Sequence, residues 1–258
     1  MPSGQEIVET LIRVDRISAE LNGADRVICM SKALKDACEA AGVEPRKLVI
    51  LGNRVSTRRF RPAPQYNYDP VFIRVLFVGR LEPQKNIHGI AQALALLRKQ
   101  SFKIDLQICG GRQMNGYLRG AMSHLQASEW HHRASVPNRE LPSLYQMADM
   151  YVGPSLFEGF QIPLIEALAC GKPCVTSDQP PANEIISQEV GALVDPSHPE
   201  SIAQGIMSVK DRLNDPHQSQ LLRAACRDRA LRNWDYRLIS KRESHLYEEV
   251  LRSHCSSD

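Results

Sequence analysis

The sequence predicts an α/β fold in which a doubly wound parallel sheet is accompanied by a partial second α/β lobe. Short apolar runs alternate with amphipathic helical patterns along most of the 258 residues. The run at 73–78 is largely apolar, which is typical of a strand buried on both faces of a parallel sheet. Residues 151–178 read as strand, loop, helix and strand. Together these patterns favour a parallel sheet with helical crossovers.

The N-terminal part already alternates between helix and strand. We expect helices at 6–21 and 31–41, the second ended by Gly42, and strands at 26–30 and 48–51. This is half of a doubly wound unit. Residues 61–70 are rich in Pro, Asn and Tyr, so a domain boundary is expected there.

The remaining chain gives the larger part of the fold. After the strand at 73–78 we expect a helix with its apolar face at 87–97, and a strand at 104–109. The later elements expected are a helix at 139–148, for which Asn138 is a candidate cap, a helix at 163–170, a strand at 191–194, and helices from Pro199 onward, with Trp234 opening the last. The predicted division is therefore a partial lobe and linker at 1–62, a larger domain at 63–232, and a C-terminal helix at 233–258.

Composition narrows the class of protein. The net charge of +3 is spread along the chain, so it indicates no nucleic-acid surface. Seven cysteines form an odd set that lies mostly within apolar segments, which predicts reduced thiols, a cytoplasmic location and no metal site. No apolar run approaches the roughly 20 residues of a membrane span, and the N-terminus lacks the pattern of a signal peptide.

Two carboxylates converge on the start of one short helix. Pro163 suits the first turn of this helix, and Gly171 ends it. Glu158 lies in the preceding loop, and Glu166 lies one turn inside the helix. A helix N-terminus suits a phosphate and carboxylates suit hydroxyl groups, so a ligand with both is indicated. The alternative, left open by the spacing, is that Glu158 caps the helix and Glu166 points into solvent.

These residues resemble a known motif. Glu158-Gly159-Phe160, followed by Pro163, Glu166, Ala167, Gly171 and Pro173, is similar to the donor-binding motif of retaining glycosyltransferases of family 4. The resemblance implies the GT-B fold, with a Rossmann-like C-terminal donor domain and a truncated N-terminal lobe. It further implies that Glu166 accepts hydrogen bonds from the ribose hydroxyls. Glu158, with amides near Gly159 and Phe160, would orient the donor sugar.

Further candidate residues lie earlier in the chain. Gly79, Arg80 and Lys85 come after the strand at 73–78, where two cations can neutralise a pyrophosphate without a metal. The resemblance implies that Arg80 and Lys85 bind the pyrophosphate and stabilise the leaving nucleotide. It also places Gly110 near the nucleotide, although a tight turn explains this glycine equally well. Val136 begins the segment where the family holds the base.

The chain departs from the family pattern in two places. Gln161 stands where the family usually has a glycine, which predicts an altered choice of donor sugar. In the linker the usual Asn-Gly-Val-Asp is replaced by Asn-Arg-Val-Ser at 53–56. The linker also carries the basic run Arg54, Arg58, Arg59 and Arg61, for which a solvated linker is favoured over a surface for acidic lipids or acceptors.

The resulting prediction is a retaining hexosyltransferase that needs no metal or other cofactor. A GDP-mannose-like donor is favoured over a UDP-sugar, and a glycan or lipid-linked acceptor in surface polysaccharide synthesis is expected. No nucleic acid is expected, and peripheral contact with the inner membrane face stays open. The principal alternative is a non-catalytic nucleotide-sugar-binding subunit; a GT-B epimerase and an NAD-binding Rossmann domain are the others. Alone, the chain is expected to bind donor without transferring sugar, and to pair with a partner chain or itself.

Overall fold

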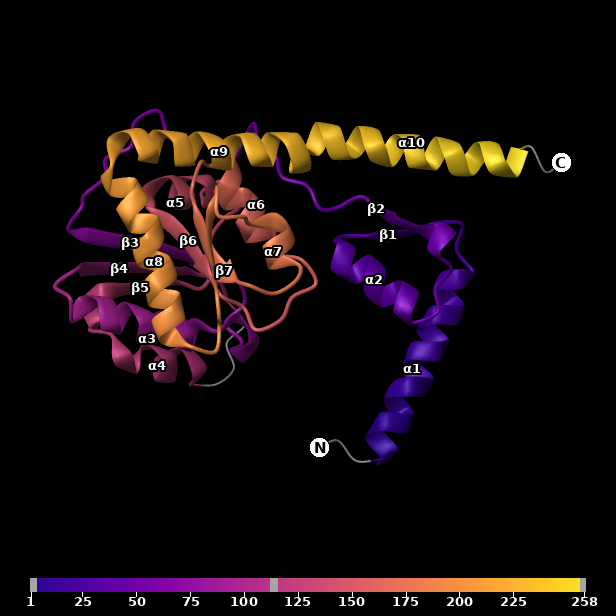
Figure 1. Cartoon of the computed structure of the whole chain (residues 1–258), viewed down its shortest axis with the longest axis horizontal. Helices are drawn as coiled ribbons and strands as arrows, with labels where there is room; N and C mark the ends of the chain where they lie inside the picture. The colour runs from indigo at the N-terminus through magenta and orange to yellow at the C-terminus, as the bar shows by residue number, and fades with distance from the viewer. Residues whose placement is uncertain (1–3, 112–115, 256–258) are drawn as a thin grey trace. The chain divides into compact units, whose positions relative to one another are not determined.

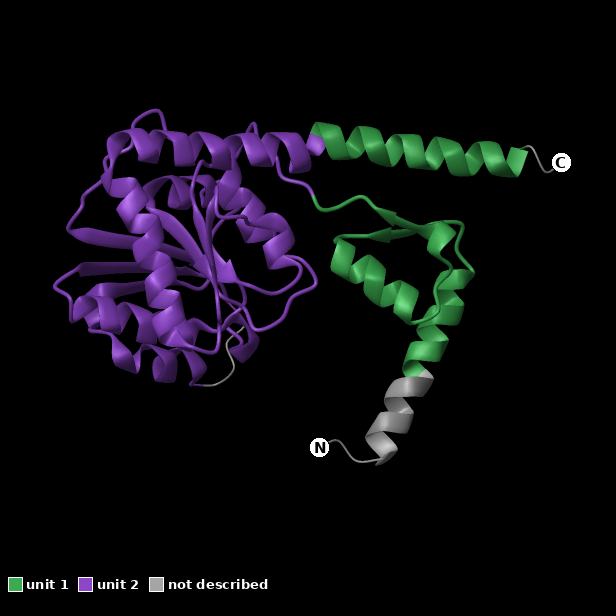
Figure 2. Cartoon of the chain, viewed as in Figure 1, with its two compact units in different colours: residues 1–53, 237–258 green, residues 54–236 purple. Residues whose placement is uncertain are grey.

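The computed structural model describes residues 4–111 and 116–255 of the chain. Its contacts divide the chain into two compact units (Figure 2). The smaller unit contains residues 1–53 and 237–258, and the larger unit contains residues 54–236. The C-terminal helix is therefore grouped with the N-terminal part of the chain, and each unit is described by itself.

The larger unit has a doubly wound parallel sheet, as the sequence predicts. Its described residues form six parallel strands in the order β5-β4-β3-β6-β7-β8. The strands are β3 (Phe72–Val78), β4 (Lys103–Cys109), β5 (Trp130–Arg133), β6 (Met150–Gly153), β7 (Cys174–Ser177) and β8 (Gly191–Val194). The chain runs outward from β3 to β5, returns to β6, and then runs outward in the other direction. The carboxyl ends of β3 and β6 therefore form the topological switch point where ligands bind in such sheets.

Helices cover both faces of this sheet (Figure 1). Helix α3 packs against α8, whereas α6 packs against α5 and α9. The α-helices of the larger unit are α3 (Ile87–Arg98), α4 (Tyr117–Ala121), α5 (Leu141–Met147), α6 (Ile162–Ala169), α7 (Ala182–Ile185), α8 (Pro199–Asn214) and α9 (Pro216–Trp234). Short 3-10 turns occupy Pro83–Lys85, Met122–His124 and Ala127–Glu129. The core contains fully buried apolar side chains from the strands and from the inner faces of these helices.

The smaller unit contains a parallel pair of short strands. Its elements are α1 (Gly4–Asn22), β1 (Val27–Cys29), α2 (Lys32–Ala40), a 3-10 turn (Pro45–Lys47), β2 (Leu48–Ile50) and α10 (Tyr236–Cys255). As predicted, α2 ends near Gly42, whose φ of 88° suits glycine. His254 of α10 lies 2.9 Å from Asp25, next to β1. No helix in the described ranges is both long and apolar enough to cross a membrane.

Two predicted helix starts are wrong. Helix α5 has Glu140 at its N-cap instead of Asn138, because residues 137–140 form a turn in which the Glu140 amide donates to the Pro137 carbonyl. Trp234 closes α9 and does not open α10. Val55 of the linker donates to the Trp234 carbonyl and accepts from the Tyr236 amide, so it interrupts the helical bonding there.

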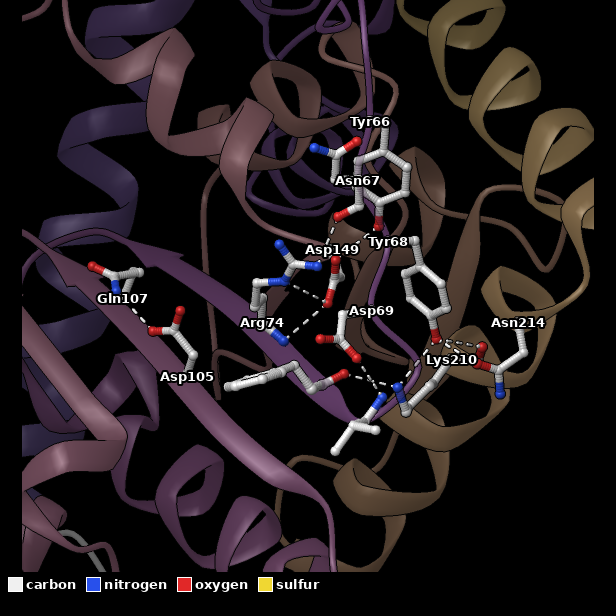
Figure 3. Close-up of polar contacts among 12 residues, drawn as sticks. Tyr66, Asn67, Tyr68, Asp69, Arg74, Asp105, Gln107, Asp149, Lys210 and Asn214 are labelled. Carbon is white, nitrogen blue, oxygen red and sulfur yellow. Dashed lines mark hydrogen bonds and ion pairs between the residues drawn. The ribbon is translucent and has the colours of Figure 1, made fainter.

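Two tyrosines fasten the segment that precedes β3 onto the larger unit (Figure 3). The Tyr66 hydroxyl donates to the buried Asp149 at 2.8 Å, and the Tyr68 hydroxyl donates to Asn214 at 2.6 Å. The Tyr66 ring lies 4.0 Å from the Lys172 ammonium and 3.9 Å from the Arg223 guanidinium. This predicted boundary segment is therefore packed against the sheet unit by aromatic, cationic and hydrogen-bonding contacts.

Lys172 should make the stability of the larger unit depend on pH. It is 1% exposed and its ammonium has no hydrogen-bond partner among the described residues. Burial, assisted by the positive charge of Arg223, lowers its pKa from 10.5 to about 7 and outweighs the opposing negative charge of Asp149. Between pH 7 and pH 10.5 this lysine is protonated in the unfolded chain but neutral in the folded chain, so the free energy of unfolding rises as the pH rises. Below pH 7 the lysine is protonated in both states, and the folded chain bears the full cost of the buried charge.

We expect Lys172→Met to be more stable than the wild type at pH 7, with an advantage that shrinks toward pH 9. The difference in the free energy of unfolding between variant and wild type should shrink by about 1.4 kcal/mol per pH unit. Denaturant unfolding at several pH values measures it, with Lys99→Met at an exposed position as the control for loss of a charge. A constant difference between the two proteins would contradict the expectation.

Candidate functional site

The loops that leave β3 and β6 meet at the switch point. The Leu156 amide donates to the Gln84 carbonyl at 2.8 Å and joins the two loops. Next to this bond the Lys85 ammonium donates to the Glu158 carboxylate. Both side chains are largely shielded, with 15% and 10% of their surface exposed. Two residues predicted for the site from distant parts of the sequence therefore form one ion pair.

Arg80 lies on the same loop but has a different partner. Its guanidinium lies 3.2 Å from the Glu82 carboxylate, and about half of the side chain, 52%, is exposed. A surface ion pair of this kind contributes little to stability. Arg80 can therefore leave Glu82 for a stronger anion at small cost, whereas Lys85 is held by a more shielded partner.

Glu166 points toward the interior and not into solvent. The hydroxyl of Tyr145, which is fully buried, donates to its Oε2 atom at 2.8 Å. Burial raises the pKa of Glu166 to about 7, while this hydrogen bond and the nearby positive charge of Arg59 oppose the rise. The alternative reading of the two carboxylates is wrong, because Glu158 is paired with Lys85 and the N-cap of α6 is Gln161.

The need for a glycine differs among the candidate glycine positions. A Cβ on Gly110 would lie 1.7 Å from the carbonyl oxygen of Gly79, and Gly110 has a φ of 152°, so close backbone packing requires this glycine. Gly159 is exposed, and a Cβ there would meet no described atom within 4 Å. The packing of the described chain therefore explains Gly110. At Gly79 a Cβ would lie 3.1 Å from the Phe77 ring, and at Gly159 the packing gives no reason for a glycine.

The remaining predicted residues come after the carboxyl ends of strands of the same sheet. Val136 and Phe160 are half-buried and pack against the core. Gln161 is buried, and its Oε1 accepts from the Thr176 hydroxyl at 3.3 Å, at the carboxyl end of β7. Its Nε2 has no partner within the described residues. No group of three or more His, Cys, Asp and Glu side chains in the described part of the chain is placed to hold a metal ion.

Sequence reasoning missed two residues at this site. Tyr145 ends the segment 136–145 that resembles the base-holding segment of the family, but nothing in the sequence links its hydroxyl to Glu166. Arg59 is exposed, as expected for a solvated linker, but its guanidinium also donates to the carbonyl of Asn138, a contact that the linker interpretation does not predict. Arg58 and Arg61 are exposed, as that interpretation predicts. The Arg59 contact spans 79 residues of sequence, which local patterns do not reveal.

Comparison with known proteins identifies the family of this sheet unit. The sequence pattern of the family described as "Glycosyl transferases group 1" matches residues 64–227, which include all the loops described above. The chain belongs to this family. The match covers the six-stranded sheet of the described structure together with α3 to α8 and most of α9.

Several curated proteins are similar to this chain. The O-antigen chain mannosyltransferase B of Escherichia coli is 33% identical over 135 residues, covering 51% of this chain and 35% of the relative. An uncharacterized glycosyltransferase of Methanocaldococcus jannaschii is 29% identical over 87% of this chain and 56% of its own length. The GDP-mannose-dependent alpha-(1-6)-phosphatidylinositol monomannoside mannosyltransferase of Mycolicibacterium smegmatis is 29% identical over 94% and 68%. The chain spans about half the length of the curated relatives it matches.

Solved structures agree with the fold. The sucrose-phosphate synthase of Thermosynechococcus elongatus has a TM-score of 0.80 at 23% identity, covering 94% of this chain and 62% of the synthase. Anabaena HepE in complex with UDP and glucose has a TM-score of 0.79 at 17% identity, covering 92% of this chain and 67% of HepE. These likenesses confirm the predicted GT-B-type α/β fold.

The hydrogen bond from Tyr145 should hold the pKa of Glu166 down. In Tyr145→Phe the carboxylate loses this donor while burial stays, so its pKa should rise further above the value of about 7. Titration of carboxyl-labelled glutamate by NMR measures it, and Glu166→Gln assigns the signal by its disappearance. An equal or lower midpoint in Tyr145→Phe would show that the bond does not stabilise the charged form.

Proposed function

We propose that the larger unit binds a nucleotide-sugar and forms the donor half of a retaining glycosyltransferase of family 4. The observation that supports this most directly is the meeting of two loops at the switch point. One brings the cations Arg80 and Lys85, and the other brings Glu158 and leads into the helix of Glu166. Cations for a diphosphate and carboxylates for sugar hydroxyls are the groups that such a donor needs.

The ion pair between Lys85 and Glu158 suggests how the donor is engaged. The diphosphate carries more negative charge than one carboxylate and would attract Lys85 away from Glu158. Glu158 would then accept hydrogen bonds from the sugar, next to the open space at Gly159. Arg80 and Lys85 would stabilise the charge that builds on the leaving diphosphate, a task for which this proposal invokes no metal or other cofactor.

A GDP-mannose-like donor is proposed over a UDP-sugar. Two of the relatives named above are mannosyltransferases, and the name of one states dependence on GDP-mannose. The proposed acceptor is a glycan or lipid-linked intermediate of surface polysaccharide synthesis, and the proposed location is the cytoplasm, at the inner face of the membrane. A relative named as a galactosyltransferase that uses UDP-Gal makes the UDP-sugar the competing donor.

A second function is a donor-binding subunit that does not transfer sugar by itself. It needs only the groups of the larger unit described above, the cations of the Lys85 loop and the carboxylates Glu158 and Glu166. Incubation of the chain with labelled GDP-mannose or UDP-glucose and a panel of acceptors separates the two. We propose binding without transfer for the isolated chain; multiple turnovers by a monodisperse monomer would reject the subunit proposal.

Calorimetry with GDP, UDP and NAD tests the binding function. We expect a nucleoside diphosphate to bind, and Lys85→Ala to weaken GDP far more than guanosine, because this ammonium is placed for the diphosphate. Lys99→Ala, at an exposed lysine, is the matched control. Indifference of the wild type to all three ligands would reject the proposal, and equal weakening of GDP and guanosine would reject the role of Lys85.

Glu166 should make nucleotide binding depend on pH. Only the carboxylate accepts from both ribose hydroxyls, and its pKa of about 7 means that affinity should rise from pH 6 to pH 8. Glu166→Ala should cost roughly 1.5 to 3 kcal/mol at pH 8 and less at pH 6, where the wild type is largely protonated. Calorimetry at both values measures this, with exposed Glu200→Ala as the control. An affinity loss that is the same at both pH values would contradict the expected role.

A further inference from the structure

Arg59 is the linker residue that reaches the candidate site. Its Nη2 donates to the carbonyl oxygen of Asn138, in the turn that follows β5. Its guanidinium carbon also lies 5.0 Å from the centre of the Phe60 ring. The side chain is therefore placed by two contacts and does not extend freely from the linker.

A chain of contacts connects Arg59 to Glu166. Phe60 is 4% exposed, and its ring meets the Tyr145 ring edge to face at 5.9 Å. The Tyr145 hydroxyl in turn donates to Glu166. The positive charge of Arg59 is near enough to favour the ionised form of the Glu166 carboxyl. Arg59 and Glu166 therefore border the same region.

Most of the hydrogen-bonding capacity of Arg59 is unused within the described chain. A guanidinium has five N–H donors in a fixed planar arrangement. One of them is engaged by Asn138, and among the described residues no carboxylate lies within ion-pair distance of Arg59. Glu140, which is close to Asn138 in sequence, is paired with Arg133 at 2.7 Å. The side chain is exposed, so its remaining donors are accessible to a ligand.

We propose that Arg59 binds the nucleobase of the donor and favours guanine. This inference rests on the proposed function, which places the diphosphate on the Lys85 loop and the ribose on Glu166. The base leaves the ribose on the side away from the 5′-phosphate, so it would lie beyond Glu166, where Arg59 and the turn at Asn138 are found. Guanine presents O6 and N7 side by side, which a guanidinium can bind with two parallel hydrogen bonds. The corresponding edge of uracil has a single acceptor, O4.

The test is the affinity of Arg59→Met for four ligands, measured by calorimetry. Methionine keeps an apolar stem and removes the donors. We expect GDP to weaken roughly 10- to 100-fold, the range for loss of a bidentate contact to guanine, and UDP by less than about threefold. Guanosine should weaken by the same factor as GDP, because the contact is with the base, whereas uridine should change little. Exposed Arg58→Met is the matched control, and thermal unfolding checks that both variants fold.

Each other outcome has a separate meaning. Equal weakening of GDP and UDP would show that Arg59 only supports Glu166, and unchanged GDP affinity would show that it takes no part; either overturns the inference and leaves the proposed function standing. A wild type that prefers UDP would also overturn the inference. A wild type that binds neither nucleotide would reject the proposed function itself, and the role of Arg59 with it.

Discussion

The candidate site depends on the divergence of two crossovers at adjacent strands. The chain passes from β3 to β4 on one side and from β6 to β7 on the other, so the crossovers of these two adjacent strands diverge and leave a crevice at their carboxyl ends. Backbone bonding from Leu156 to Gln84 and the ion pair of Lys85 with Glu158 hold the loops that begin these crossovers together across that crevice. Helix α6 begins directly after the second loop, so the position of Glu166 depends on the same constraint.

Many of the elements could be predicted because local chemistry fixes them. The strand at 191–194 has the predicted bounds, and α6 differs from prediction by one residue at each end, since Pro163 and Gly171 limit it. The start of α5 could not be predicted, because Asn138 is a good cap by composition but lies in a turn. The break before α10 results from Val55, which is remote in sequence and contributes its backbone hydrogen bonds at Asp235.

Part of the candidate site could also be predicted from local sequence. Arg80, Lys85 and Glu158 carry charges in loops that follow strands, and topology alone brings these strand ends together. Glu166 lies in the helix that follows the second of these loops. The neighbours of Glu166 were not predictable: the Tyr145 hydroxyl and the Arg59 guanidinium come from a helix and a linker, and reach the site through packing around Phe60. Gly110 also illustrates the limit, since its close approach to Gly79 is a structural need that looks like a ligand contact in the sequence.

The two carboxylates of the site are held in different ways, and this bears on what each can do. Glu158 has a cation against it, so its charge is already balanced and becomes available only when Lys85 finds another anion. Glu166 accepts a hydrogen bond from a neutral hydroxyl and has only the more distant Arg59 guanidinium as a positive charge. Burial raises its pKa to about 7. A ligand that brings both a diphosphate and hydroxyl groups changes both balances at once: the diphosphate competes for Lys85, and the hydroxyl donors favour the ionised form of Glu166. On the proposed function, a nucleoside diphosphate brings both parts, because its ribose supplies the hydroxyl groups for Glu166 while its diphosphate competes for Lys85. Glu158, once released from Lys85, would then be left with an unbalanced charge, and a sugar attached to the diphosphate would supply hydroxyl donors for it.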